Sequence, residues 1–327
     1  MARITILGAG GFGMALSIAA HNVGHDVSIW SAFSDEIVSL KKTRTNERLL
    51  PGVILPEEVF LTDDINVAEN SDITIIAVPS VAVSSVAKQL SQVKNHGIVV
   101  CVAKGFVPKI NSRLSVVISE ALPNDNVVVL SGPSHAEEVA RNIPTLLVAA
   151  STSLVASQIV QDMLSSQYLR IYTSDDVVGV ELGGAMKNII AICAGICDGL
   201  KLGDNTKAAL ITRGLSEMTR LGVIMGANES TFSGLAGVGD LVVTCTSRHS
   251  RNNRFGALVG SGADINEALK TVGTVEGYYA VAIVHRLAKK YRVELPLMEE
   301  CYRILYKNRD VSGVVKHLML RPKHYEY

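Results

Sequence analysis

The chain has 327 residues, and its 31 lysines and arginines balance 31 aspartates and glutamates, so the formal net charge is zero. That length fits about two domains of ordinary size. A neutral chain lacks the general attraction to phosphate backbones or anionic lipid that a basic excess supplies, so neither nucleic acid nor a membrane surface is expected as a partner.

The mean hydropathy is +0.28, yet no run reaches the roughly 18 to 20 uninterrupted apolar residues that span a bilayer. The five cysteines form no CxxC pair, and no signal-peptide pattern follows the first methionine. This usage predicts neither a disulfide framework nor a zinc site. We therefore expect a cytoplasmic protein without a membrane span or a bound metal.

The first half alternates short β-branched runs with helical segments, which predicts a mainly parallel sheet built from strand–helix–strand units. Several runs are continuously apolar, as is typical of strands covered on both faces. The predicted strands are residues 3–7, 26–30, 73–78, 98–102, 127–130, 145–149 and 169–172. The predicted helices are residues 13–23, 81–92, 109–121, 136–141 and 152–164.

After about residue 173 the strand pattern fades and helical spacing dominates. The predicted helices are residues 205–221, 265–270, 276–291, 296–306 and 311–320, with one short β-like run at 241–244. A long apolar segment, 175–200, joins the two halves. The predicted fold is therefore α/β: a Rossmann-type domain at residues 1–175 followed by an all-α domain at 176–327, tightly packed with a cleft between them.

A glycine-rich loop, GAGGFG at residues 8–13, lies between the first predicted strand and the first predicted helix. In such a loop Gly8 permits a tight turn, Gly10 lets backbone N–H groups approach a pyrophosphate, and Gly13 lets helix and strand pack closely. The strand–turn–helix context favours dinucleotide binding. The alternative is a glycine turn that serves packing alone.

The second predicted strand ends at Trp30, where an acidic residue normally holds the ribose 2′-hydroxyl of NAD. The first carboxylates, Asp35 and Glu36, come later, and no arginine stands there to meet the 2′-phosphate of NADP. The choice of coenzyme stays open, with a slight lean to NADP because no carboxylate repels its phosphate. Trp30 either contacts the adenosine or belongs to the core.

Lys187 interrupts the most apolar predicted helix. At helical spacings of three, four, seven and eight, one face next to it carries only small residues, which leaves room for a closely packed backbone or a ligand. These residues are Gly183, Gly184, Ala191, Ala194 and Gly195. A buried ammonium group loses its proton easily, as a catalytic base near neutral pH requires. The alternative is a lysine that reaches solvent or pairs with a carboxylate such as Asp240.

Lys104 ends the fourth predicted strand, where an open α/β sheet has its ligand crevice. There it could bind an anionic substrate and lower the pKa of Lys187 by repulsion. After the fifth strand, residues 131–137 (SGPSHAE) bring hydroxyl and backbone N–H groups to the same rim. Ser134 could equally cap the helix that follows.

A glycine cluster at residues 234–239 ends in Asp240, which could orient a substrate hydroxyl, shift the pKa of Lys187, or simply cap a helix.

Farther along the chain, Arg248, Arg251 and Arg254 alternate with serine and asparagine. This pattern fits a phosphate clamp at a helix start, or an ordinary solvated basic face.

Glu276 begins a predicted helix, where it either caps the helix or meets a nicotinamide amide or ribose. His135 and His249 lie near the candidate sites. Neither histidine is paired with a carboxylate in a recognisable motif, so neither is favoured as the catalytic base.

Motifs at residues 8–13, 103–105, 131–138, 181–188, 234–241, 250–252 and 275–277 follow one another in this order. Together they resemble the soluble NAD(P)-dependent glycerol-3-phosphate dehydrogenases over nearly the whole chain. The resemblance implies hydride transfer between C2 of sn-glycerol 3-phosphate and C4 of the nicotinamide. It implies Lys187 as the proton acceptor, a homodimer, and a role in supplying glycerol 3-phosphate for phospholipid synthesis.

The resemblance also assigns binding residues. Those implied for the substrate are Lys104, Gly132, Ser134, Lys187, Asp240, Ser250, Arg251 and Asn252. Those implied for the coenzyme, together with the loop glycines Gly8, Gly10, Gly11 and Gly13, are Phe12, Trp30, Lys104, Ala136, Arg251, Val275 and Glu276. Many relatives carry an arginine where this chain has Ala32, which puts the usual 2′-phosphate contact in doubt.

Two other functions fit parts of this pattern. A hydroxyacid, ketopantoate or phosphogluconate-type dehydrogenase has the same architecture, but a carboxylate substrate does not require the clamp at residues 250–252. A non-catalytic NAD(P) sensor has no use for a phosphate clamp that faces a lysine.

Overall fold

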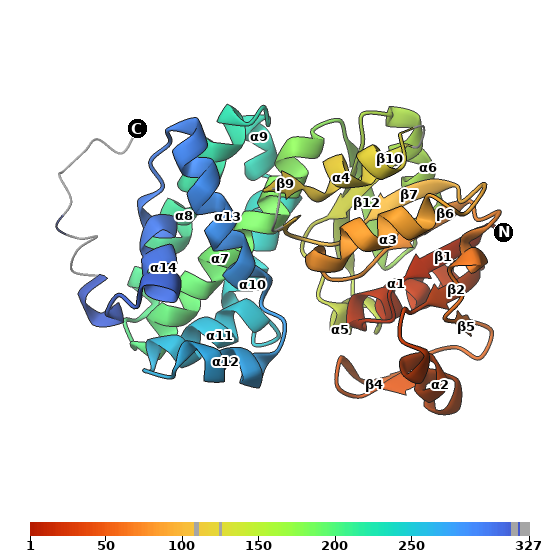
Figure 1. Ribbon diagram of the computed structural model, residues 1–327, viewed down its shortest axis with the longest axis horizontal. Coiled ribbons are helices and arrows are strands. Elements are labelled where there is room, and N and C mark those ends of the chain that lie inside the picture. The colour runs from red at the N-terminus through yellow and green to blue at the C-terminus, as the bar shows by residue number, and fades with distance from the viewer. Residues whose placement is uncertain (108–110, 124–125, 315–319, 321–327) are drawn as a thin grey trace.

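The computed structural model describes residues 1–107, 111–123, 126–314 and 320. The first half holds an eight-stranded sheet with the order β12-β11-β10-β7-β6-β1-β2-β5 (Figure 1). Neighbouring strands are parallel, except that β11 runs antiparallel to β10. The strands are β1 Arg3–Leu7, β2 Asp26–Trp30, β5 Phe60–Thr62, β6 Ile73–Ile76, β7 Ile98–Cys101, β10 Val127–Ser131, β11 Thr145–Ala150 and β12 Leu169–Ser174.

The seven predicted strands are confirmed within a few residues at each end. The sequence pattern did not predict the edge strand β5 or two short hairpins, β3 Thr45–Asn46 with β4 Leu50–Ile54 and β8 Phe106–Val107 with β9 Ser112–Arg113. The central strand β6 is buried at every position, as its continuous apolar run predicts.

Helices cover the sheet on both faces, because successive residues of a strand point to opposite sides. Ile6 packs into a core cluster with α1 and α6, whereas Leu7 packs into a second cluster with α3 and α4. The helices of this half are α1 Gly11–Asn22, α2 Ser34–Thr43, α3 Val83–Leu90, α4 Leu114–Ala121, α5 Ala136–Val139 and α6 Leu154–Leu164.

The described residues after β12 form helices and connecting turns but no strand, which confirms the predicted fold class. These helices are α7 Val177–Gly199, α8 Asp204–Ile224, α9 Glu229–Phe232, α10 Asp240–Thr246, α11 Arg251–Gly260, α12 Ile265–Val272, α13 Glu276–Tyr291 and α14 Pro296–Lys307. Residues 315–319 of the predicted helix 311–320 lie outside the described residues, as do residues 109–110 of the predicted helix 109–121.

The run 241–244 was expected to be β-like, and this prediction is wrong. These residues lie within α10, which continues directly from a π-helical turn at Leu235–Gly239. Leu241 and Cys245, one helical turn apart, are both buried in the helical core. Packing against α7 therefore overrides the local β preference of Val242 and Val243.

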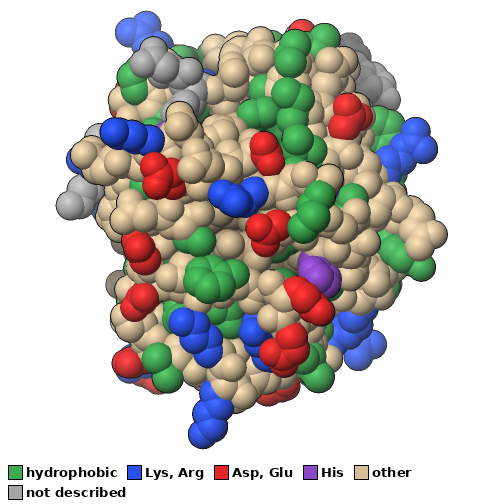
Figure 2. All heavy atoms as spheres, turned by 90° about the vertical axis from the view of Figure 1, so that its right-hand side faces the viewer, with side chains coloured by type: hydrophobic (Ala, Val, Ile, Leu, Met, Phe, Trp, Pro, Cys, Tyr) green, Lys and Arg blue, Asp and Glu red, His purple; other side chains and the backbone are tan. Residues whose placement is uncertain are grey.

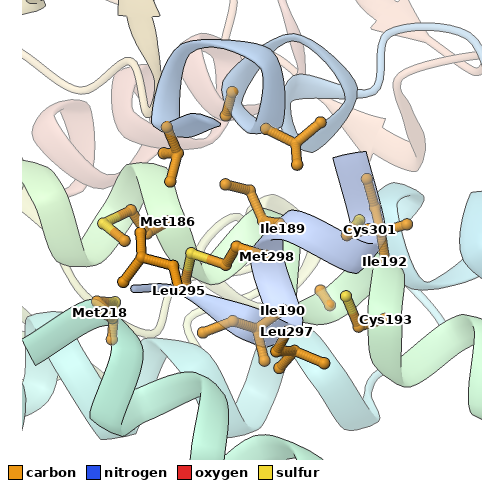
Figure 3. Close-up of a cluster of buried hydrophobic side chains, with 14 of the residues drawn as sticks. Met186, Ile189, Ile190, Ile192, Cys193, Met218, Leu295, Leu297, Met298 and Cys301 are labelled. Carbon is orange, nitrogen blue, oxygen red and sulfur yellow. The ribbon is translucent and has the colours of Figure 1, made fainter. Parts of the chain in front are cut away.

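Helix α7 is the centre of the second half and is buried from Gly179 to Cys197. Its length and mean hydropathy of 1.5 would suffice to cross a membrane, but 89% of its most apolar window lies inside the protein. Figure 3 shows apolar side chains of α7, among them Met186 and Ile189, packed against Met298 of α14 and Met218 of α8.

Another side of α7 is held backbone to backbone. A Cβ added to Gly183 would lie 2.2 Å from the carbonyl oxygen of Ala236, and one added to Gly195 would lie 2.0 Å from that of Asn253. At Gly184, in contrast, an added Cβ would meet Ser131 Oγ at 2.8 Å. The small-residue face of α7 thus admits both close backbone packing and polar groups from the sheet.

Candidate active site

The glycine loop lies where the strand order of the sheet reverses. The chain runs outward from β1 through β2 to β5, and then returns to β6 on the other side of β1. Gly8 has a φ of +131°, and a Cβ there would lie 2.6 Å from the carbonyl oxygen of Ala77, just after β6. In open α/β sheets this reversal point is where ligands bind.

The glycine loop is open on the side of Gly10, the residue just before α1. Gly10 precedes the helix without a side-chain cap, and a Cβ at Gly10 would meet nothing within 4 Å. Gly13 packs against the loop itself, since its Cβ would lie 2.1 Å from the Gly8 oxygen. Backbone N–H groups at a helix start bind phosphate, so this cradle fits the pyrophosphate of a dinucleotide.

Two other predicted coenzyme residues border this cradle. A Cβ on Gly11 would lie 3.8 Å from that of Ala136, the first residue of α5, and 2.5 Å from the Leu49 oxygen in the β3–β4 turn. Phe12 is partly buried and packs against the core cluster that contains α1. The loop is therefore enclosed by α5 and the hairpin.

Trp30 and Val275 are buried, with 2% and 0% of their surface exposed. The Trp30 indole donates a hydrogen bond to the Asp63 carbonyl at 2.9 Å, so of the two interpretations of its side chain the core one holds. A coenzyme contact at these two positions would have to come from the backbone.

Four predicted substrate residues meet in one charged cluster. The Lys104 ammonium donates to Asp240 Oδ2 at 2.7 Å and to the Gly132 carbonyl at 2.8 Å. The Lys187 ammonium donates to the other carboxylate oxygen, Oδ1, and to Thr244 Oγ1 at 2.8 Å. Asp240 thus bridges a lysine beside the sheet and a lysine in the middle of α7.

The surroundings of this cluster set its charge states. Burial lowers the pKa of Lys187 from 10.5 to about 7, with Lys104 adding to the shift and Asp240 opposing it. Burial alone would raise the pKa of Asp240, but the two ammonium groups hold it below its ordinary value. At neutral pH Lys187 can therefore exchange a proton while Asp240 stays ionised, as general acid–base catalysis requires. Lys187 is both paired with Asp240 and able to titrate.

The start of α11 carries the predicted phosphate clamp. Ser250 caps the helix by accepting a hydrogen bond from the Asn253 N–H at 3.2 Å. The Asn252 amide donates to Asn188 Oδ1 and accepts from the Gly277 N–H, both at 2.9 Å, so it ties together α11, α7 and α13. Arg251 is exposed and makes no hydrogen bond within the described residues, which leaves its guanidinium available to an anion.

Glu276 links the two halves of the chain. Its carboxylate accepts hydrogen bonds from the Ser80 N–H at 3.2 Å and the Ser80 hydroxyl at 2.5 Å. Burial raises its pKa, while the bonds from Ser80 and the charge of Arg251 act in the opposite direction. A second link is the pair of Arg113 Nη1 and Glu181 Oε2, 2.7 Å apart.

The loop after β10 adds polar atoms beside this cluster. Ser134 Oγ donates to the Gly132 carbonyl at 3.0 Å, and the cap position of α5 belongs to His135, so the interpretation of Ser134 as a helix cap is wrong. Within the described structure, Ser131 Oγ and His135 Nε2 are buried without a hydrogen-bond partner. Burial lowers the pKa of His135, and the charge of nearby Lys187 lowers it further. Unpaired buried polar atoms are rare in folded proteins, so these two atoms are expected to bind a water or a ligand.

Comparison with known proteins covers both halves. The sequence model described as the NAD-dependent glycerol-3-phosphate dehydrogenase N-terminus matches residues 3–157, and that of the C-terminus matches residues 176–316. The chain belongs to this family. A glycerol-3-phosphate dehydrogenase (NAD(P)+) of Desulfitobacterium hafniense (strain Y51) is 47% identical over 328 residues, which cover 100% of this chain and 93% of that protein.

The solved structures agree. A glycerol-3-phosphate dehydrogenase from Coxiella burnetii is similar with a TM-score of 0.94 at 40% identity, covering 98% of this chain and 99% of that one. A ketopantoate reductase of Ralstonia eutropha JMP134 has a TM-score of 0.60 at 13% identity, covering 97% of this chain and 99% of that one. The second likeness shows a shared fold alone.

The sequence patterns do not identify three residues of the site: Thr244, Ser131 and Ser80. Thr244 lies four positions after Asp240, so it shares a helix face with it, but the expected β-like run hid this relation. Ser131 is the first residue of the motif at 131–138, but no sequence pattern around it indicates that its hydroxyl is buried beside Gly184. Ser80 carries no sequence signal, because only the folded chain brings it to Glu276.

Proposed function

We propose that the protein is an sn-glycerol-3-phosphate dehydrogenase (NAD(P)+) that interconverts dihydroxyacetone phosphate and sn-glycerol 3-phosphate. The observation that carries the proposal is the buried Lys187, with its pKa lowered to about 7, bound to the carboxylate that also binds Lys104. The full-length relatives that bear this enzyme name support it.

In the oxidative direction Lys187 accepts the proton of the substrate C2 hydroxyl, and in the reductive direction it returns a proton to that oxygen. Asp240 stays charged and offsets the two ammonium groups, so that Lys187 titrates near neutral pH instead of far below it. Lys104 adds positive charge where the polar substrate docks. The bound nicotinamide coenzyme supplies or accepts the hydride.

The phosphate of the substrate is assigned to the start of α11. Arg251 offers a guanidinium fork, and Ser250 and Asn252 lie on either side of it at the helix N-terminus. On the opposite rim, Gly132 and Ser134 contact the rest of the substrate. The residues assigned to the coenzyme are Gly8, Gly10, Gly11, Phe12, Gly13, Trp30, Lys104, Ala136, Arg251, Val275 and Glu276.

The same proposal covers the context of the protein. The coenzyme domain spans residues 1–175 and the substrate domain 176–327, and the protein works in the cytoplasm as a homodimer, supplying glycerol 3-phosphate for phospholipid synthesis. All five cysteines are free and buried, which suits a reducing compartment. On the face in Figure 2, basic and acidic side chains are interspersed, so its described part offers no extended basic surface to nucleic acid.

The test is a spectrophotometric assay of NADH and NADPH oxidation with dihydroxyacetone phosphate, and with ketopantoate as the carboxylate control. We expect turnover with the phosphorylated ketone, and a loss of at least about 100-fold in kcat for Lys187→Met with coenzyme affinity retained. Absence of turnover with dihydroxyacetone phosphate refutes the proposal. Turnover with ketopantoate alone supports the hydroxyacid-type alternative, and coenzyme binding without any turnover supports the sensor.

A further inference from the structure

We propose that Glu36 receives the adenosine ribose 2′-hydroxyl of the coenzyme and makes this protein select NADH over NADPH. The inference rests on the proposed function in one respect, namely that the glycine loop holds a dinucleotide. It reverses the lean to NADP that the sequence alone favours.

In the folded chain the Glu36 carboxylate lies at the end of β2, although Glu36 comes six residues after Trp30 in the sequence. Glu36 lies in the first turn of α2, and that helix begins only four residues after the strand ends at Trp30. The turn brings the Glu36 carboxylate back to Ser31, whose hydroxyl donates to Glu36 Oε2 at 2.5 Å. Ser31 Oγ also accepts a hydrogen bond from the Phe33 N–H at 3.2 Å, so both groups are fixed in place.

This position is next to the glycine loop. Strands β1 and β2 pair in register, with Leu7 opposite Trp30, and the Gly8 N–H donates to the Trp30 carbonyl at 2.8 Å. Ser31 therefore follows the strand directly beside the proposed pyrophosphate cradle. In dinucleotide-binding folds an acidic group at this point accepts the ribose 2′-hydroxyl.

The charges at this rim oppose a 2′-phosphate. Glu36 has no ion-pair partner within the described residues, and its neighbour Ala32 supplies no cation. A second carboxylate, Asp63, accepts a hydrogen bond from Ser34 Oγ at 2.5 Å at the same strand ends. The hydrogen bond from Ser34 is the largest cause that lowers the pKa of Asp63, and the charge of Lys41 lowers it further.

Besides Lys41, which is exposed in the last turn of α2, two arginines lie on this side of the sheet. Arg44 binds the Val59 carbonyl at 2.8 Å and pairs with Glu57 at 3.2 Å. Arg48 is exposed in the β3–β4 turn, next to Leu49, whose carbonyl lies over Gly11. Arg48 therefore lies close in the chain to the residue that covers the proposed pyrophosphate cradle, and it is the rival that the experiment must exclude.

The experiment measures the dissociation constants of NADH and NADPH by calorimetric titration of the full-length protein without substrate, followed by kcat/KM with dihydroxyacetone phosphate. The variants are Glu36→Gln, Ser31→Ala and Arg48→Ala. The matched control is Asp35→Asn, which removes a neighbouring charge of α2 that makes no hydrogen bond to Ser31.

We expect the wild type to bind NADH at least about tenfold more tightly than NADPH, since a charged hydrogen bond is worth about this much. Glu36→Gln should reduce this ratio at least about tenfold, Ser31→Ala should reduce it less, and the Asp35→Asn and Arg48→Ala ratios should stay within about twofold. Tighter NADPH binding by the wild type overturns the inference, as does an unchanged ratio in Glu36→Gln or an equal change in Asp35→Asn. If NADH is preferred but dihydroxyacetone phosphate is not reduced, the proposed function fails while the role of Glu36 stands.

Discussion

Replacing Asp240 with asparagine tests the electrostatic basis of the proposed catalysis. The Asp240 carboxylate is 1% exposed and binds the ammonium groups of both Lys104 and Lys187. The asparagine amide would keep the shape of the side chain but remove its negative charge. The two ammonium groups would then repel each other without compensation.

The size of the effect follows from burial and contact. Burial has already lowered the pKa of Lys187 to about 7 against the opposing pull of Asp240. An opposite charge at contact distance shifts a pKa by about one to three units, so its loss should move the pKa of Lys187 further down by a similar amount. Because Lys104 and Lys187 lose their shared buried partner, the free energy of unfolding should also fall by about 3 to 5 kcal/mol.

The assay is kcat/KM for oxidation of glycerol 3-phosphate between pH 5.5 and 9 with saturating coenzyme. In the wild type the value should rise with pH through about 7, because only neutral Lys187 accepts a proton; kcat/KM for the reductive reaction should fall through the same range. In Asp240→Asn the inflection should move at least about one pH unit lower, so that the oxidative profile is already level above about pH 7. Thr244→Val, which removes a neutral partner of Lys187, serves as the control and should keep the wild-type inflection. An inflection at the wild-type pH in Asp240→Asn would refute the assignment.

Three further substitutions test the coenzyme loop, the contact between the halves and the buried lysine. Gly13→Ala should abolish coenzyme binding in calorimetric titration, because its Cβ would lie 2.1 Å from the Gly8 oxygen; near-normal affinity would argue against the cradle. Glu181→Gln deprives Arg113 of its carboxylate and should lower the free energy of unfolding in urea by up to about 3 kcal/mol, and a change below about 0.5 kcal/mol would contradict the link. The pKa of Lys187 is 10.5 in the unfolded chain and about 7 in the folded protein. Between these two pH values the unfolded chain binds more protons, so the free energy of unfolding should rise with pH in this range and be level below about pH 7. Lys187→Met should remove this part of the slope, and identical slopes in variant and wild type would exclude a buried, titrating lysine.

The sheet was predictable because its strands carry their own signal. Strands such as β6 are apolar at nearly each position, and glycine or proline follows several of them, so their limits are visible locally. The run 241–244 failed because four residues fit either a strand or a buried helix. Only its packing against α7 decides between the two.

The glycine loop was likewise visible in the sequence, since its three roles depend on neighbouring residues. Lys187 stood out as a charge within an apolar helix. Its partnership with Asp240 spans 53 residues, and that of Lys104 with Asp240 spans 136, so no local pattern could decide between pairing and catalysis. Glu36 was seen but set aside, because counting positions along the chain does not show that α2 folds it back onto Ser31.

The glycine contacts of α7 limit how this protein can be redesigned. Gly195 on α7 and Gly256 on α11 each face the other helix's carbonyl groups, with added Cβ atoms 2.0 Å from the Asn253 and Ile192 oxygens. Because backbone meets backbone at this interface, no side chain there can change its rotamer to make room for a larger residue. The position of Lys187 on α7 therefore cannot be shifted by substitutions in that helix. Attempts to evolve activity on other ketones should therefore succeed through the loops after β7 and β10 and the first turn of α11, and screens of α7 should return mostly inactive or insoluble protein.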